Sequence, residues 1–392
     1  MAEGREFDTI VYGASGYTGR LVAEYLQKQY GNGSDVKWAI AGRSAEKLAA
    51  VRDEVGLPAD TPIVVANSDD PASLKEMANR AGVIISTVGP YQLYGSEVVA
   101  TCVETGTDYV DLCGEPLWMR NMIDAHSARA KETGARIVHS CGFDSIPSDL
   151  GVFKLQNEAK ARFGSAAPRV KGRVRSMNGS FSGGTAASFK ATMVAVQEDP
   201  TLVQKMFDPF VLAGSFRGPE QPPGMEAELD PALDMWVGPF VMAAINTKNV
   251  HRSNALLDGA YGENFVYDEM MVTGPGEAGK AAAESLGEMN AAIGTTDLKP
   301  GDGPSKEERE AGDYDILFIG ENGDGKDIRL GVTGDRDPGY GSTSKMLAEA
   351  ALCIAKDCSD VDGGVWTPAS AMGDKLIARL VANAGLTFDL EN

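Results

Sequence analysis

The sequence contains few of the residues that build metal centres or disulfide frameworks. Its 392 residues include only three histidines, and its five cysteines are an odd number with no CxxC pair. No histidine lies at ligand spacing from another histidine or from a cysteine, so the sequence predicts neither a metal site nor a disulfide framework. Reduced thiols of this kind are typical of a cytoplasmic protein.

Basic residues are also scarce. The chain has 36 lysines and arginines against 56 aspartates and glutamates, which gives a net charge of −20. A surface of that sign repels polyanions, so the sequence predicts no nucleic-acid partner. No apolar run approaches the length of a membrane span, and the polar N-terminal residues predict no signal peptide. We therefore expect a cytoplasmic protein, with peripheral membrane contact left open.

Glycines, by contrast, form a pattern near the N-terminus. The stretch FDTIVYGASGYTG at residues 7–19 has an apolar run before the glycines, and an amphipathic, helix-like segment follows it. Glycine allows a tight turn and the close approach of a phosphate, and the helix directs its first amides at that phosphate. The sequence therefore predicts a dinucleotide site. Its turn consists of Gly13, Ser15, Gly16, Tyr17, Thr18 and Gly19.

Residues 1–145 alternate between strand-like apolar runs and helix-like segments. The strand-like runs lie at 9–12, 37–41, 62–66, 82–87, 108–112 and 135–139. Parallel neighbours need crossover connections, so the alternation predicts an α/β Rossmann-type domain with a doubly wound parallel sheet. Right-handed crossovers place all carboxyl ends of the strands at one edge, where the ligand binds.

The residues after the second and third strands indicate the cofactor. Sites for NAD(H) usually carry an acid after the second strand, and Arg43 stands there instead. A guanidinium suits a 2′-phosphate, and Lys47 adds a second positive charge one turn later. The pattern favours NADP(H) over NAD(H), with a solvated helix-start residue as the alternative for Arg43. Ser44 and Asp69 complete this part of the site, although Asp69 would equally suit a helix cap.

The turn after the fourth strand is expected to pass the nicotinamide end of the cofactor. Its glycine–proline pair forms a rigid bend, which would project Tyr91 towards the cleft. The cofactor residues predicted in this turn are Ser86, Thr87, Val88, Gly89, Pro90 and Tyr91.

The pattern changes near residue 146. From there to residue 338, strand-like runs alternate with long polar loops, which predicts an α+β domain with an antiparallel sheet. A hairpin is expected across the GDG at 323–325, and a charged surface loop at 297–313. Residues 342–356 and the end of the chain are read as helices.

A dinucleotide site without a metal predicts hydride transfer, which for many substrates needs a proton donor. Tyr91, Asp144 and Arg252 are the catalytic candidates, with a solvated or capping role as the alternative for each. Arg252 lies in the segment 236–257, where polar amides and a cation follow an apolar run. Such a mixture suits a pocket for an acyl or carbonyl substrate.

Several longer stretches resemble the saccharopine dehydrogenase-like family. They are GASGYTGRLVAEYL, AGRSAEKL, STVGPYQLYGSEVVATCVETGTDYVDLCGE and HSCGFDSIPSDLG. PFVMAAINTKNVHRSNALL, DPGYGSTSKMLAEAALCIA and GGVWTPASAMGDKLIARL resemble its enoyl reductase branch. The resemblance implies a Rossmann domain at 1–145, an α+β domain at 146–338, and a segment at 339–392 that packs back on the first domain. It also implies a nicotinamide cofactor and reduction of a carbon–carbon double bond in a polyketide or lipid intermediate.

Three functions stay open at this point. The first is an NADPH-dependent reductase of an unsaturated acyl substrate, because 236–257 would form an apolar cleft with Lys248 and Arg252 as its only cations. The second is a saccharopine-type dehydrogenase, whose substrate carboxylates would require more cations. The third is a nucleotide-binding interaction protein, associated with lipid or membrane, with little turnover. The resemblance is also compatible with a homodimer.

Overall fold

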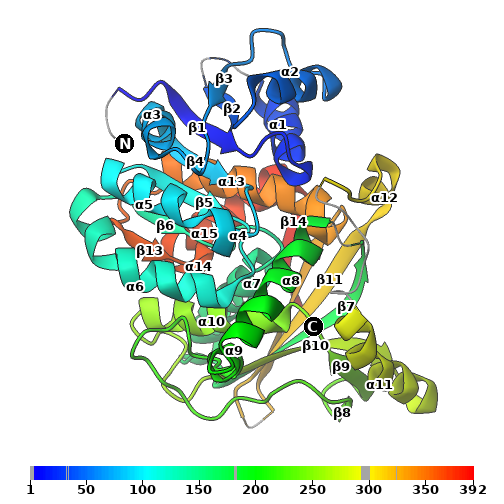
Figure 1. The fold of residues 1–392 in the computed structure, drawn as a ribbon. Helices are drawn as coiled ribbons and strands as arrows, with labels where there is room; N and C mark the ends of the chain where they lie inside the picture. The colour runs from blue at the N-terminus through cyan, green and yellow to red at the C-terminus, as the bar shows by residue number, and fades with distance from the viewer. Residues whose placement is uncertain (1–3, 32, 34, 181–182, 293–300, 324) are drawn as a thin grey trace.

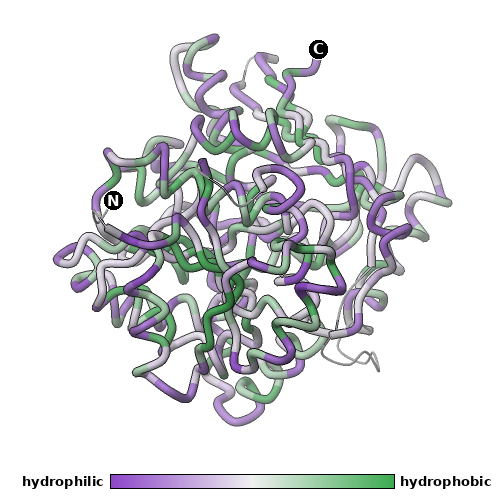
Figure 2. Tube along the Cα trace, turned by 90° about the horizontal axis from the view of Figure 1, so that it is seen from above, coloured by the Kyte–Doolittle hydropathy of each residue, from purple (hydrophilic) through white to green (hydrophobic). Residues whose placement is uncertain are grey.

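The computed structural model describes residues 4–31, 33, 35–180, 183–292, 301–323 and 325–392. Within these residues, two seven-stranded sheets form the framework, and helices pack between and around them (Figure 1). Hydrophobic segments gather towards the middle of the molecule, and hydrophilic ones are more frequent towards its rim (Figure 2). No helix in the described part of the chain is both long and apolar enough to cross a membrane.

The first sheet is entirely parallel, in the order β13-β6-β5-β4-β1-β2-β3. Its strands are β1 (Phe7–Tyr12), β2 (Trp38–Gly42), β3 (Ile63–Val65), β4 (Ala81–Ser86), β5 (Asp108–Asp111), β6 (Arg136–Val138) and β13 (Gly364–Trp366). The predicted Rossmann-type sheet is thereby confirmed. The strand order reverses between β1 and β4, which places the ligand crevice at the carboxyl ends of these two strands.

Helices cover both faces of this sheet, which explains why its strands read as continuous apolar runs. Ile10 and Ile84 face one hydrophobic core, and their chain neighbours Val11 and Ile85 face the other. The covering helices are α1 (Tyr17–Tyr30), α2 (Ala45–Glu54), α3 (Pro71–Arg80), α5 (Ser96–Thr105), α6 (Pro116–Thr133) and α13 (Thr343–Lys356). Alternate residues of each strand therefore stabilise opposite layers.

The second sheet has the order β14-β12-β11-β7-β10-β9-β8. Its strands are β7 (Arg169–Asn178), β8 (Glu228–Asp230), β9 (Met235–Pro239), β10 (Val266–Gly274), β11 (Asp313–Glu321), β12 (Asp327–Gly334) and β14 (Leu386–Glu391). The expected hairpin is present as β11 and β12. The sheet is mixed rather than wholly antiparallel, because β7 and β10 run parallel.

The helices of the second half lie between β6 and β11 in the chain. They are α7 (Ile146–Phe163), α8 (Gly183–Glu198), α9 (Leu202–Phe207), α10 (Ala243–Leu256), α11 (Gly276–Ala292) and α12 (Lys306–Ala311). Helix α7 stands where the sequence predicted strand-like runs and loops, and it packs on β11, β12 and α10. Residues 297–300 of the expected charged loop lie outside the described residues, and the remainder includes α12.

The C-terminal segment contributes to both sheets. After the short π-helix η2 (Pro338–Ser342), α13 packs against α1 and under β1, β4 and β5. The chain then adds β13 to the edge of the first sheet, continues through α14 (Pro368–Ala371), α15 (Gly373–Arg379) and η3 (Leu380–Ala384), and adds β14 to the second sheet. Neither of these two strands was expected from the sequence, which indicated helices and a turn.

Candidate functional site

The glycine turn between β1 and α1 has the geometry that an anion site requires. Gly13 has a φ of 91°, a conformation that glycine adopts without strain, and a Cβ there would lie 2.7 Å from Thr87 Oγ1. A Cβ on Gly19 would lie 2.3 Å from the Gly13 carbonyl oxygen, so α1 can approach the turn only with glycine at this position. Gly16 caps α1 without a side-chain hydrogen bond, and no acid lies in the first turn. The first amides of α1 can therefore bind an anion.

The carboxyl ends of β2 and β3 form the expected adenosine side. Arg43 is exposed directly after β2. Ser44 caps α2 by accepting a hydrogen bond from the Lys47 backbone N–H at 3.2 Å. Asp70 rather than Asp69 caps α3, so the alternative reading of Asp69 as a cap is wrong.

Tyr12 also belongs to this region, although the sequence reasoning did not single it out. Burial raises the pKa of its hydroxyl, while a hydrogen bond with Ser68 and the charge of Arg43 oppose the increase and Asp69 adds to it. The hydroxyl therefore lies where residues after β1, β2 and β3 converge. In the sequence, the position of Tyr12 directly before Gly13 was the observation that could have indicated its place in this region.

The turn after β4 lies against the glycine turn, as expected, but Tyr91 does not project towards a cleft. The side chain is 5% exposed, and its hydroxyl donates to the Ser86 carbonyl at 2.9 Å and accepts from the Leu112 N–H at 3.4 Å. Its ring packs on Trp118, with the centroids 5.4 Å apart. The expected orientation is wrong because the first position of α4 (Tyr91–Tyr94) places a large ring over the interior. Burial raises the pKa of Tyr91 well above its ordinary value.

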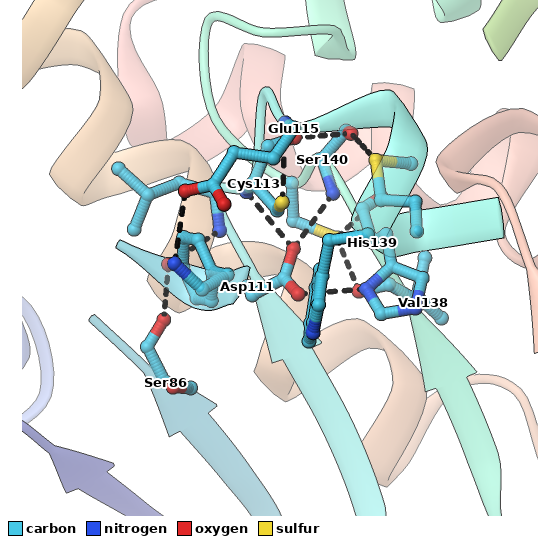
Figure 3. A network of polar contacts seen from close by, with 12 residues as sticks. Ser86, Asp111, Cys113, Glu115, Val138, His139 and Ser140 are labelled. Carbon is cyan, nitrogen blue, oxygen red and sulfur yellow. Dashed lines mark hydrogen bonds and ion pairs between the residues drawn. The ribbon is translucent and has the colours of Figure 1, made fainter. Parts of the chain in front are cut away.

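A buried polar network lies at the carboxyl ends of β4, β5 and β6 (Figure 3). Asp111 is at its centre, and one of its oxygens accepts from the backbone N–H groups of Cys113 and Ser140 at 3.0 and 2.9 Å. The other oxygen lies 2.7 Å from His139 Nδ1. This carboxylate therefore fixes the loops that follow β5 and β6. The sequence reasoning had treated His139 as a core or surface residue and did not single out Asp111.

Glu115 joins this network to the second half of the chain. Its oxygens accept from the backbone N–H groups of Tyr91 and Gln92 at 2.8 and 2.9 Å, and from the Ser188 hydroxyl at 2.8 Å. Glu115 therefore holds both the start of α4 and helix α8, and burial raises its pKa. It follows β5 by four residues, and an acid near a strand end was the only signal in the sequence.

Asp144 lies in the loop between β6 and α7. The residue is partly accessible, yet its Oδ1 is buried and has no hydrogen-bond partner among the described residues. Burial raises the pKa of this carboxyl group to about 7, and the charge of Glu269 adds to the increase. Asp144 is therefore a carboxyl group that can hold or release a proton near neutral pH.

A second buried acid, Glu269 of β10, lies near this carboxyl group. It accepts hydrogen bonds from Asn246 Nδ2 at 2.9 Å and from the Tyr267 hydroxyl, and burial raises its pKa. Asn249, one turn after Asn246, donates to the Ser145 hydroxyl at 2.9 Å. Polar groups of α10 and β10 therefore lie near the loop that carries Asp144. The sequence reasoning pointed to the asparagines and missed Glu269.

Arg252 lies apart from these groups. It is 5% exposed and donates to the carbonyl groups of Leu212 and Val365 at 2.5 and 2.6 Å. Burial lowers its pKa to about 10. Lys248 is buried on the same helix. The expectation that 236–257 lines an apolar cleft is wrong, because α10 packs between α7 and β10 and most of its side chains are buried.

A pocket of about 240 Å³ opens next to the polar network. Glu115, Trp118 and Thr192 line it, and Arg120 and Lys205 are its cations. Helices α4, α8 and α9 expose apolar side chains nearby, which are Leu93, Tyr94, Phe189, Met193, Val203 and Phe207. An exposed apolar surface of this kind suits an apolar ligand or partner.

Comparisons with known proteins decide the family. Residues 9–138 match the model of the saccharopine dehydrogenase NADP binding domain. A trans-acting enoyl reductase of Mycobacterium ulcerans is 39% identical over 404 residues, which cover 96% of both chains. The chain belongs to the saccharopine dehydrogenase-like family. A Mycobacterium tuberculosis protein with a provisional assignment as a trans-acting enoyl reductase is 41% identical over 418 residues, 98% of this chain and 97% of that one.

A solved structure agrees with the fold of this saccharopine dehydrogenase-like chain. Apo saccharopine dehydrogenase (L-Glu forming) from Saccharomyces cerevisiae superimposes with a TM-score of 0.54, covering 98% of this chain and 99% of that one at 11% identity. The protein is an NADP-binding oxidoreductase of this family. At this identity, the yeast enzyme supports the two-sheet architecture alone.

The residues present fit NADP. No side chain caps the start of α1, so its first amides can bind the pyrophosphate, and the contact of Gly13 with Thr87 leaves no room for a Cβ in this turn. Residues 13–19 and 86–90 lie together, and Arg43, Ser44, Lys47 and Asp69 follow the neighbouring strands. Among the described residues, no group of three or more His, Cys, Asp or Glu side chains is placed to hold a metal ion.

Proposed function

We propose that this protein uses NADPH to reduce a carbon–carbon double bond in an acyl substrate. When bound, the cofactor supplies a hydride, and a proton must then reach the neighbouring carbon. The observation that carries the proposal is Asp144, a partly accessible carboxyl group whose Oδ1 has no partner in the described structure and whose pKa is about 7. Relatives named as trans-acting enoyl reductases support the choice of a double bond.

The proposed roles of the residues follow from their surroundings. The β-carbon of an enoyl group gains the hydride, and Asp144 donates its carboxyl proton to the α-carbon as the double bond becomes single. Solvent then reprotonates the carboxylate, so each turnover consumes NADPH and one proton. Burial keeps a large fraction of this group protonated at neutral pH. Asn246 and Asn249 are buried and donate to Glu269 and Ser145, so their proposed role is to position the loop that carries Asp144.

Tyr91 and Arg252 have no place in this proposal. The Tyr91 hydroxyl is held by the Ser86 carbonyl and the Leu112 N–H, and the Arg252 guanidinium is held by two carbonyl groups. Both side chains are therefore engaged in maintaining the fold.

An apolar substrate and a preference for NADPH over NADH are part of the same proposal. The exposed apolar residues of α4, α8 and α9 support an acyl chain. Arg43, which replaces the usual acid after β2, supports recognition of the 2′-phosphate. A homodimer, peripheral membrane contact and a cytoplasmic location stay predictions.

The experiment is to monitor NADPH absorbance with two substrate panels. One contains enoyl thioesters of increasing chain length, and the other combines oxo acids with amines or amino acids. The proposal expects oxidation with the first panel alone, increasing with chain length. Oxidation with the second panel alone would instead indicate a saccharopine-type dehydrogenase, and NADPH binding without any oxidation would indicate an interaction protein.

The role of Asp144 is tested by Asp144→Asn. Without the transferable proton, turnover is expected to fall at least about 100-fold, while the NADPH dissociation constant stays within about twofold of the wild-type value. In the wild type, turnover is expected to fall above about pH 7, because the donor must be protonated. Full turnover by the variant would remove Asp144 from the mechanism.

A further inference from the structure

Arg309 comes from α12 of the second domain, yet it lies at the cofactor turn of the first. Its Nη1 donates to the Tyr17 hydroxyl and to the Pro304 carbonyl, both at 2.8 Å. Its guanidinium carbon lies 5.7 Å from the centre of the Tyr17 ring. Tyr17 is the first residue of α1, whose amides face the anion. A cation of the second domain therefore stands beside the anion-binding end of this helix.

The contact between the two domains is closely packed. A Cβ on Gly303 would lie 2.5 Å from the Tyr17 ring, so the backbone of this segment rests directly on the ring. Tyr340 from η2 packs edge-on to Tyr17, with the centroids 5.1 Å apart. The Arg309 carbonyl accepts from the Asp337 N–H at 3.0 Å, which joins α12 to η2. Residues 301–312, which we call the α12 segment, are therefore held against the glycine turn from two sides.

The charge of Arg309 is not neutralised by an ion pair. No carboxylate of the described residues lies within ion-pair distance of it, and its Nε and Nη2 make no hydrogen bond to those residues. Asp337, whose pKa the Arg309 charge affects, uses its oxygens to accept from the backbone N–H groups of Tyr340 and Gly341. In contrast, Arg20 of α1 pairs with Glu54 at 2.8 Å. Arg309 therefore has N–H groups that can donate hydrogen bonds to a phosphate, and its positive charge would attract that phosphate.

We propose that Arg309 binds the pyrophosphate of NADP, so that the second domain supplies a cofactor ligand. The amides of α1 and the guanidinium would then hold the same phosphates from two domains. The 2′-phosphate is attached at a different position of the adenosine ribose and is the proposed partner of Arg43. Cofactor affinity therefore depends on how the α12 segment sits on Tyr17. The identity of the acyl substrate has no part in this inference.

The test measures binding without substrate, by NADPH fluorescence and by calorimetry with two fragments. The fragment 2′-phospho-ADP-ribose contains the pyrophosphate, whereas 2′-AMP keeps the 2′-phosphate and has no phosphate at the 5′ position. Arg309→Ala is expected to weaken NADPH and 2′-phospho-ADP-ribose about 10-fold or more, as loss of a charge-assisted hydrogen bond to phosphate requires. It should leave the dissociation constant of 2′-AMP within about twofold of the wild-type value. Arg309→Lys, which keeps the positive charge, should weaken the binding of NADPH and 2′-phospho-ADP-ribose by a smaller factor.

Lys306→Ala is the matched control, because it removes one positive charge from the exposed side of the same helix. It should leave all three affinities unchanged. Gly303→Val keeps Arg309 but forces the α12 segment away from Tyr17, and it is expected to weaken the two pyrophosphate ligands alone. An Arg309→Ala protein that binds NADPH within about twofold of wild type would overturn the proposal, as would an equal loss of affinity for 2′-AMP. Both outcomes are independent of whether the enzyme reduces enoyl substrates.

Discussion

Asp144→Asn is expected to stabilise the folded protein above neutral pH, although we also expect it to lower activity. The pKa of this carboxyl group is about 7 in the folded protein, against an ordinary value of 3.8. The folded state therefore binds the proton more tightly, and its stability falls as the pH rises from about 4 to about 7. At 1.36 kcal/mol per pKa unit, the loss approaches about 4 kcal/mol. This is an upper bound, because the residue is partly accessible.

The assay is urea unfolding of the wild type and the variant at about pH 5 and about pH 8. Asparagine has the same shape and does not ionise, so the variant does not lose stability as the pH rises. The free energy of unfolding of the variant minus that of the wild type should therefore increase by roughly 3 kcal/mol from the lower to the higher pH. A variant that is less stable than wild type at the higher pH would refute the reasoning, because it would show that the carboxylate is ionised and well bonded in the folded state.

Asp230→Asn serves as the control of opposite sign. Burial would raise the pKa of Asp230, but the charge of Arg173 and its hydrogen bond outweigh burial and lower it. The two side chains lie 2.6 Å apart. A lowered pKa contributes stability that is present at neutral pH and lost in acid. Asp230→Asn should therefore be less stable than wild type at about pH 8, and the difference should shrink as the pH falls.

The remaining predictions concern the cofactor and the buried polar groups. Arg43→Asp is expected to lower the ratio of NADPH to NADH affinity about 10-fold or more, and an unchanged ratio in fluorescence titrations would contradict our reading of β2. Gly19→Ala should abolish NADPH binding, because its Cβ would lie 2.3 Å from the Gly13 carbonyl oxygen. Arg252→Met should lower the free energy of unfolding by about 2–4 kcal/mol, because two buried carbonyl groups lose their donors, while the KM of the stable fraction stays constant. Asp111→Asn should destabilise the protein by about 1–3 kcal/mol in urea, since the loops after β5 and β6 lose a shared acceptor.

The first domain could be predicted because its signals are local. The apolar runs, the glycines of 13–19 and the caps after each strand lie within a few residues of the features that they determine. The orientation of Tyr91 could not be predicted in this way. It depends on Trp118 and on the Ser86 carbonyl, and these contacts exist only in the folded protein.

The second half of the chain contains elements and contacts that local sequence patterns could not predict. The first residues of α7 are buried all round and include Pro147 and Gly151, so they lack both amphipathic periodicity and helix propensity. Strands β13 and β14 are stabilised by partners more than fifty residues away. Asp144 was named from its place after a strand, whereas Glu269, which raises its pKa, belongs to a different sheet. Their proximity is a property of the tertiary structure alone.

A single-turnover experiment with NADPH deuterated at the transferable position tests the central claim most directly. An enoyl thioester is incubated with the wild type and with Asp144→Asn, and the products are analysed by mass spectrometry and NMR. With the wild type we expect deuterium at the β-carbon and a solvent hydrogen at the α-carbon, and with the variant we expect the reduced product to form at least about 100-fold more slowly. A reduced product from the variant at the wild-type rate, or a wild-type product without deuterium at the β-carbon, would contradict this mechanism.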